Sequence, residues 1–254
     1  MISRYEAVLN GISLESISSD ILIHDISHSP AEFRDDTFTV AKRNGSRLYR
    51  RYFSSSSVSI KFEIHSYSIA QRQAICDAVC VWAKNGGVLV TNDRNGQFLQ
   101  CVCSEFPSVQ SARNWTDELT VSFEAYTIPF WQESVVQNVS ATGTSGSGTF
   151  WVPGSGDKTF VEVDILANAS LSSVSLTVNG RTLNLSDLSV SSGSTIKIAY
   201  DTDGIQSIKV GTTSLLNKRT GVDDLLADCA KYNTYSFTAS ASVTVTFKVR
   251  GLWV

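Results

Sequence analysis

The sequence contains few of the residues from which active sites are usually built. It has three histidines, four prolines and one methionine among 254 residues. His24, His28 and His65 show no spacing typical of a nucleophile–base pair or a two-histidine metal arm. His65 occupies the solvent-facing position of a strand pattern, and the other two are expected in a polar loop, so we expect all three at the surface. We predict no catalytic residues and no enzyme activity.

Long apolar runs and a strong charge imbalance are also absent. No apolar segment approaches the roughly 20 residues that span a bilayer, and the first six residues lack the order of a secretion signal. The formal net charge is -3, which gives no overall attraction to nucleic acid or an anionic membrane. We expect a protein made in the bacterial cytoplasm, with neither a membrane nor a specific nucleic-acid sequence as partner.

The five cysteines allow two interpretations. Cys76 and Cys80 are one helical turn apart and Cys101 and Cys103 share a strand face, so four thiolates could converge on zinc. The spacings differ from those of zinc knuckles, however, and buried cysteine is common core filler. An odd number of cysteines also argues against a disulfide framework. We therefore predict free thiols, no metal and no cofactor.

The first half of the sequence predicts strands around one helix. Apolar and polar residues alternate over 58–65 and again over 119–126, the period of a half-buried strand. Ser68 followed by Gln71 predicts a capped amphipathic helix over 69–84, which ends at Asn85-Gly86-Gly87. Residues 88–91 and 97–103 flank a polar turn and predict a hairpin. A first domain is expected over 1–132.

The second half predicts short strands. Residues 133–149, rich in serine, glycine and threonine, are expected to form a flexible linker. A second domain over 150–254 is then predicted to be a β-sandwich. A type I′ turn is expected at Val178-Asn179-Gly180-Arg181 and a short helical turn over 222–230. Its expected strands are 160–166, 171–178, 181–185, 196–200, 205–210, 235–239 and 243–249.

Several separated motifs resemble the siphophage distal tail proteins, which form a ring between tail tube and tail tip. The segment Asn10-Gly11-Ile12-Ser13-Leu14 is similar to the family's opening motif, and Arg43-Asn44-Gly45 stands where the family tends to carry a similar turn. Trp82 to Leu89 resembles the family's helix ending, and Phe123 to Trp131 its exit from the first domain, although Ile128 replaces an aspartate there. The resemblance covers about residues 8–132 well and the remainder loosely.

The resemblance implies a mainly β fold and a structural function in the virion. It implies a tail-tube-like N-terminal β-sandwich or split barrel with one amphipathic helix, and a peripheral galectin-like or carbohydrate-module-like C-terminal β-sandwich. It also implies a hexameric ring that joins the tail tube to the adsorption apparatus around a channel for DNA. The expected partners are further copies of the chain, a tail tube protein and a tail-tip hub protein, and the expected location is the phage tail tip.

We expect two regions of the first domain to contact neighbouring subunits. One is the basic segment 34–53, which reads as a solvated loop; its Arg43, Arg47, Arg50 and Arg51 would meet Asp35, Asp36 or Asp93 of the next subunit. The other is the helix and hairpin over 69–103.

An alternative function is carbohydrate binding or adhesion through the second domain. Its exposed aromatic residues would form a stacking platform for sugars, with Trp151, Tyr200 and Trp253 as the candidates. Aromatic residues in a sandwich are more often part of the core, so this remains the second hypothesis.

Overall fold

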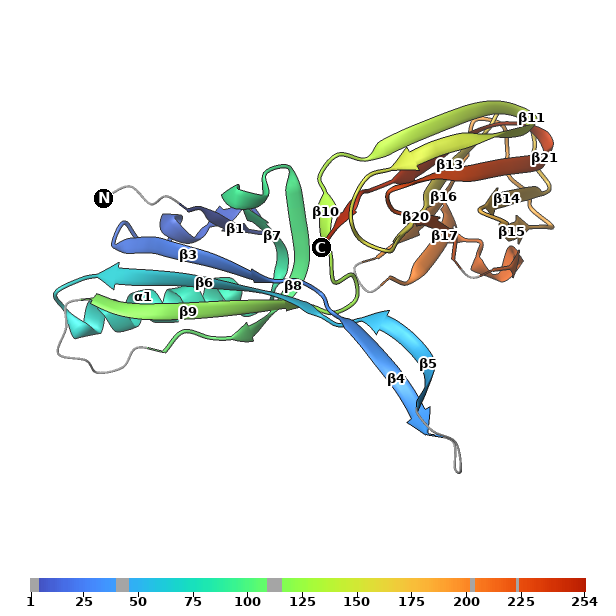
Figure 1. Cartoon of the computed structure of the whole chain (residues 1–254). Coiled ribbons are helices and arrows are strands. Elements are labelled where there is room, and N and C mark those ends of the chain that lie inside the picture. The colour runs from blue at the N-terminus through green and yellow to red at the C-terminus, as the bar shows by residue number, and fades with distance from the viewer. Residues whose placement is uncertain (1–4, 40–45, 109–115, 202–203, 223) are drawn as a thin grey trace. The chain divides into compact units, whose positions relative to one another are not determined.

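The computed structural model describes residues 5–39, 46–108, 116–201, 204–222 and 224–254, which form two compact units (Figure 1). Unit 1 comprises Met1–Trp131 together with Val254, and unit 2 comprises Gln132–Trp253. Strands dominate both units, and α1 (Ile69–Ala83) is the one α-helix in the described ranges. The predicted mainly β fold class is confirmed. No helix among these residues is both long and apolar enough to cross a membrane.

The main sheet of unit 1 is antiparallel and runs in the order β2-β1-β7-β8-β9-β6-β3. Its strands are β1 (Ala7–Leu9), β2 (Ile12–Ser13), β3 (Ile21–Ser29), β6 (Ser56–His65), β7 (Gly87–Thr91), β8 (Gln97–Glu105) and β9 (Thr116–Ala125). Short 3-10 turns cover Leu14–Ser16 and Asn92–Arg94. The predicted strands over 58–65 and 119–126 and the hairpin that follows the helix are confirmed.

The core of unit 1 lies between this sheet and α1. Phe62 and Phe123, on adjacent strands, are fully buried, and Trp82 of α1 meets the Phe123 ring edge-on at 5.8 Å. The Ser68 hydroxyl accepts a hydrogen bond from the Gln71 backbone N–H, so the predicted cap is confirmed. The Gln71 side chain instead donates to Asp20 at 2.9 Å. Burial of apolar side chains of this kind stabilises the unit.

Two of the motifs that carry the family resemblance are in direct contact. Asn10 has a φ of 52°, and its side-chain amide accepts from the Val88 N–H and donates to the Gly86 carbonyl, each at 2.9 Å. Trp82 donates its indole N–H to the Ile12 carbonyl, also at 2.9 Å. A Cβ atom on Gly87 would lie 2.1 Å from the Asn10 side chain, so only glycine fits there. The amino-terminal turn therefore locks the end of α1 to the start of β7.

The segment predicted to be a solvated basic loop is instead a two-stranded arm. Strands β4 (Phe33–Thr39) and β5 (Ser46–Phe53) pair with each other in an antiparallel hairpin. Figure 1 shows this arm extending beyond the ends of β3 and β6. The loop interpretation was wrong because Phe33 pairs across the hairpin with Phe53 and Asp35 with Arg51, which are cross-strand contacts that composition alone does not reveal.

Unit 2 is built around one long strand, β21 (Lys231–Val249). Its first half pairs with β14 and its second half with β13, while β11 pairs along its length on the other side. The main path is β18-β17-β16-β13-β21-β14-β15-β19, and β12 pairs separately with β20. The strands of these sheets are β11 (Gln137–Val152), β12 (Lys158–Phe160), β13 (Glu162–Ala167), β14 (Val174–Val178), β15 (Arg181–Leu185), β16 (Thr195–Tyr200), β17 (Gln206–Val210), β18 (Thr213–Ser214), β19 (Arg219–Gly221) and β20 (Leu226–Asp228). Two short strands outside these sheets, β10 (Trp131–Glu133) and β22 (Leu252–Trp253), pair with each other. A 3-10 turn covers Leu216–Lys218.

The expected flexible linker over 133–149 is wrong, because most of it belongs to β11. Its serines and threonines alternate with glycines, so the segment has the period of a strand. A Cβ atom on Gly146 would lie 2.5 Å from the Phe237 ring, and one on Gly148 would lie 2.8 Å from the Tyr235 ring. These glycines therefore make room for buried aromatic rings of β21 and do not provide flexibility.

Two further details of unit 2 differ from the prediction. The short helical turn expected over 222–230 is wrong, because β20 lies there and pairs with β12. The strands expected over 235–239 and 243–249 are parts of the single strand β21. The expected type I′ turn is confirmed, since Asn179 and Gly180 both have positive φ, 48° and 78°.

Candidate interaction surfaces

The β4–β5 arm exposes aromatic and aliphatic side chains. Phe33 is 61% exposed, Leu48 54% and Tyr49 78%. At the base of the arm the Phe33 ring lies 4.3 Å from that of Phe53, which in turn meets Phe130 edge-on at 4.9 Å. A two-stranded hairpin is at best marginally stable alone, and exposed aromatic residues beside arginine are typical of protein interfaces.

The charged residues of the arm are partly neutralised within the arm itself. Arg51 makes two hydrogen bonds to Asp35, at 2.6 and 2.7 Å, and its guanidinium lies over the Phe33 ring. Hydrogen bonding to Arg51 lowers the pKa of Asp35, and the same contact raises the pKa of Arg51. Asp36 is the cross-strand partner of Arg50 in the register. Within one subunit, Asp35 thus meets an arginine of its own arm.

The other candidate interface residues have different positions. Arg50 lies over the Tyr52 ring at 5.3 Å, and the backbone of Arg47 belongs to β5. Arg43 lies outside the described residues. Asp93 is in the turn between β7 and β8, where its carboxylate is 2.5 Å from Nε2 of His28. The structure therefore joins Asp93 to β3 and not to the arginines of the arm.

Around Asp93, side chains from separate parts of unit 1 form a small cluster. The His28 ring meets Trp131 edge-on at 5.3 Å, and Arg94 lies over the same indole and donates to the Val254 carbonyl oxygen at 3.4 Å. Burial alone would raise the pKa of Asp93, but hydrogen bonds, including that with His28, outweigh it, so this pKa lies below its ordinary value. The prediction that His24 and His28 lie in a loop was wrong, because both are on β3.

The hairpin of β7 and β8 presents a valine strip, which consists of Val88, Val90 and Val102. These side chains are 36–47% exposed, whereas Leu89 and Leu99 on the opposite face are fully buried. Exposed apolar side chains gathered on one sheet face are typical of an interaction surface. The alternation of exposed and buried residues on β7 is visible in the sequence, but the sequence does not reveal which element covers which face.

The three aromatic residues of the expected glycan platform do not form one site. Trp151 pairs with Tyr232 at a ring distance of 5.1 Å, and both are exposed. Tyr200 stacks on Phe160, and its hydroxyl interacts with the Gln206 side chain and the Leu225 N–H. Trp253 is half-buried on β22. Burial raises the pKa of the Tyr200 hydroxyl. Among the described residues, no ring contact joins any two of the three candidates.

All five cysteines are free thiols, as predicted. Cys76 and Cys80 both point to the Pro107 carbonyl, at 3.3 and 3.8 Å, whereas Cys101 points to the Gly87 carbonyl. Burial raises the pKa of Cys101 to about 12 and that of Cys229 to about 11, so both are protonated at neutral pH.

The remaining histidines share one carboxylate. His24 on β3 and His65 on β6 each lie 3.1 Å from a different oxygen of Glu63. His24 is the extra residue of a bulge between Ile23 and Asp25, which turns its side chain toward Glu63. In the part of the chain that the structure describes, no group of three or more histidine, cysteine or acidic residues could hold a metal ion.

Comparison with known proteins finds relatives in structure but not in sequence. No family model matches the sequence, and no curated protein matches it. The chain is similar to the Dit protein (gp 19.1) of phage SPP1, described as a paradigm of the hub adsorption apparatus in phages that infect Gram-positive bacteria, with a TM-score of 0.71 and 12% identity over 97% of this chain and 98% of that one. A chain of the phage P2 baseplate in its calcium-activated conformation matches less well, with a TM-score of 0.49 and 9% identity over 99% of this chain.

The likeness to SPP1 Dit extends over both units. The fold expected from the resemblance to the distal tail proteins is therefore confirmed, although the galectin-like character of the second unit stays a prediction.

Proposed function

We propose that this chain is a structural component of a phage tail tip. In this proposal, six copies form a closed ring that joins the tail tube to the adsorption apparatus around a channel for DNA. The observation that carries the proposal is the likeness of the whole chain to SPP1 Dit, with a TM-score of 0.71 over nearly all of both chains. The motifs shared with the distal tail proteins support it independently, since they come from the sequence alone.

The arm supplies one side of the contact between neighbouring subunits. A closed ring needs two different surfaces on each copy, because every subunit contacts its neighbours head to tail. The arm projects from the sheet and exposes Phe33, Leu48 and Tyr49. Burying these side chains against the next subunit would offset the weak stability of an isolated hairpin.

The valine strip is our candidate for the second surface. It lies on the hairpin of β7 and β8, within the region 69–103 that the sequence predicts to contact a neighbouring subunit. Its exposed valines are apolar side chains that the arm of that neighbour could cover. Edge strands such as β3 offer backbone groups for pairing in addition. Asp35 and Arg51 form an ion pair with no net charge. In this arrangement the pairing lowers the cost of transferring the two charged groups from water into the contact.

A pair of matched variants tests the arm. Leu48→Glu places a charge in the proposed contact, whereas Leu216→Glu places the same charge on an exposed leucine of unit 2. Light scattering after size-exclusion chromatography should give about 166 kDa, six times the 27.7 kDa chain, for the wild type and for Leu216→Glu. Leu48→Glu should run as smaller species whose strand content, measured by circular dichroism, matches that of the wild type. The arm is not the contact if Leu48→Glu assembles as the wild type does.

A further inference from the structure

Unit 2 carries an exposed sheet face made almost wholly of hydroxyl side chains, which we call the hydroxyl face. It is formed by the outward residues of four neighbouring strands, β11, β21, β14 and β15. The first row across them is Ser145, Thr238, Ser175 and Asn184. The next row is Ser147, Ser236, Thr177 and Thr182. Thr149 and Thr234 continue the pattern on the two longer strands.

This face is unusual because it bears no charge at any of these positions. Charged residues make up 18% of the chain, so about two of ten positions would be expected to carry a charge. The inward residues of the same strands, such as Leu176, Leu183 and Phe237, are buried in the core. The core therefore does not require hydroxyl side chains at the outward positions.

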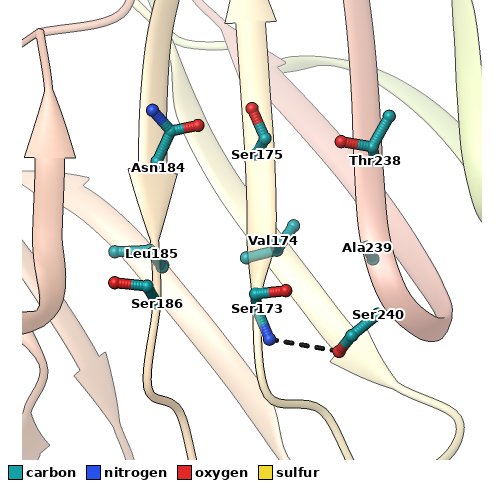
Figure 2. Close-up of a pocket in the computed structure, with 9 residues that line it drawn as sticks. All are labelled: Ser173, Val174, Ser175, Asn184, Leu185, Ser186, Thr238, Ala239 and Ser240. Atoms are coloured by element: carbon teal, nitrogen blue, oxygen red, sulfur yellow. Dashed lines mark hydrogen bonds between the residues drawn. The ribbon is translucent and has the colours of Figure 1, made fainter.

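A groove of about 370 Å³ opens at one end of the face (Figure 2). Figure 2 shows Asn184, Ser175 and Thr238 side by side on three strands, above the level of Leu185, Val174 and Ala239. None of the side chains of Asn184, Ser175 and Thr238 makes a hydrogen bond to another described residue. Their donors and acceptors are thus available to a ligand.

The opposite end of the face carries its only large aromatic residues. Trp151 and Tyr232 are cross-strand partners, 44% and 74% exposed, with their rings 5.1 Å apart. Trp151 is six residues along β11 from Ser145, which at about 3.3 Å per residue separates the aromatic pair from the groove by about 20 Å. One extended ligand could reach both.

The chemistry of the face favours one class of ligand. A protein partner would need an apolar centre to bury, and between the groove and the aromatic pair the face offers only serine and threonine. An anionic or cationic ligand would need opposite charges, and the face has none. A neutral chain of sugars matches it, because its hydroxyls both donate and accept and its C–H faces pack on indole and phenol rings.

We propose that the hydroxyl face of unit 2 binds an uncharged glycan chain, held by Trp151 and Tyr232 at one end and by Asn184, Ser175 and Thr238 in the groove at the other. This site differs from the platform expected from the sequence, since it includes neither Tyr200 nor Trp253. It does not depend on ring assembly, because all of its residues belong to unit 2.

The test uses the full chain and four hexasaccharides. Maltohexaose, cellohexaose and chitohexaose are neutral, and hexagalacturonate is an anionic control. Binding is followed by isothermal titration calorimetry and by saturation-transfer NMR. At least one neutral hexasaccharide should bind with a Kd of about 1 mM or tighter, and hexagalacturonate should not bind.

Three variants locate the site. Trp151→Ala and Asn184→Asp should each weaken binding about tenfold. Asn138→Asp makes the same change as Asn184→Asp on the amino-terminal half of β11, and it should bind as the wild type does. The proposal is overturned if no neutral hexasaccharide binds at 10 mM. It is overturned equally if Trp151→Ala and Asn184→Asp bind unchanged, or if they alter only the oligomeric state, which would make the face a protein contact.

Discussion

Replacing Asn10 by alanine should destabilise unit 1 and leave unit 2 unchanged. The side chain makes two hydrogen bonds of 2.9 Å to backbone groups that flank the end of α1 and the start of β7. A net contribution of about 0.5–1.5 kcal/mol for each bond gives about 1–3 kcal/mol. Alanine also tolerates the φ of 52° less well than asparagine, which adds about 1 kcal/mol. Because the Asn10 side chain is exposed, we expect a total of about 2–3 kcal/mol.

Hydrogen exchange measured by mass spectrometry separates the two units. Peptides of β7 and α1 should lose protection corresponding to about 2–3 kcal/mol in Asn10→Ala, and peptides of β21 should keep theirs. Asn10→Asp keeps the acceptor for the Val88 N–H but sets a carboxylate oxygen against the Gly86 carbonyl in place of the donor, so it should lose at least half as much. Glycine adopts a positive φ without strain, so the loss of stability in Asn10→Gly measures the contribution of the two side-chain hydrogen bonds alone. A change below about 0.5 kcal/mol in Asn10→Ala would refute the reasoning, since the two bonds would then contribute nothing.

Three further predictions follow from the packing and the ionisable groups. Gly148→Ala should destabilise unit 2 by about 1–3 kcal/mol, because its Cβ atom would lie 2.8 Å from the Tyr235 ring, and urea unfolding should show no such loss for the outward-facing Ser147→Ala. The lowered pKa of Asp93 contributes stability that is fully present above the ordinary value of 3.8 and is lost as the pH falls through the folded-state pKa. Asp93→Asn should therefore be less stable than the wild type at neutral pH and lose less stability on acidification, which acid unfolding followed by tryptophan fluorescence measures. Native Cys101 and Cys229 should resist iodoacetamide at pH 8, whereas both should be labelled after unfolding in urea, as peptide mass spectrometry will show.

The sequence predicted the elements whose patterns arise from local chemistry. Ser68 caps α1, and Val58, Ile60 and Phe62 alternate with polar residues, so helix and strand can be read directly. The turn at Asn179 and Gly180 follows from the ability of these residues to adopt positive φ. These predictions required no knowledge of distant contacts.

The errors arose where the reason for a residue lies far away in the sequence. Gly146 and Gly148 resemble a linker until Phe237 and Tyr235, some 90 residues later, are known to fill the space beside them. The arm resembles a loop because its strands pair only with each other and bury little. For the same reason, the sequence grouped Trp151 with Tyr200 and Trp253, whereas the register of β11 and β21 pairs it with Tyr232.

Electron microscopy of the purified chain tests the central claim most directly. If the arm of each copy seats on its neighbour, class averages should show closed rings of six subunits with an open centre, and Leu48→Glu should abolish them. Isolated particles of 27.7 kDa at every concentration, both alone and with tail tube protein added, would contradict the account.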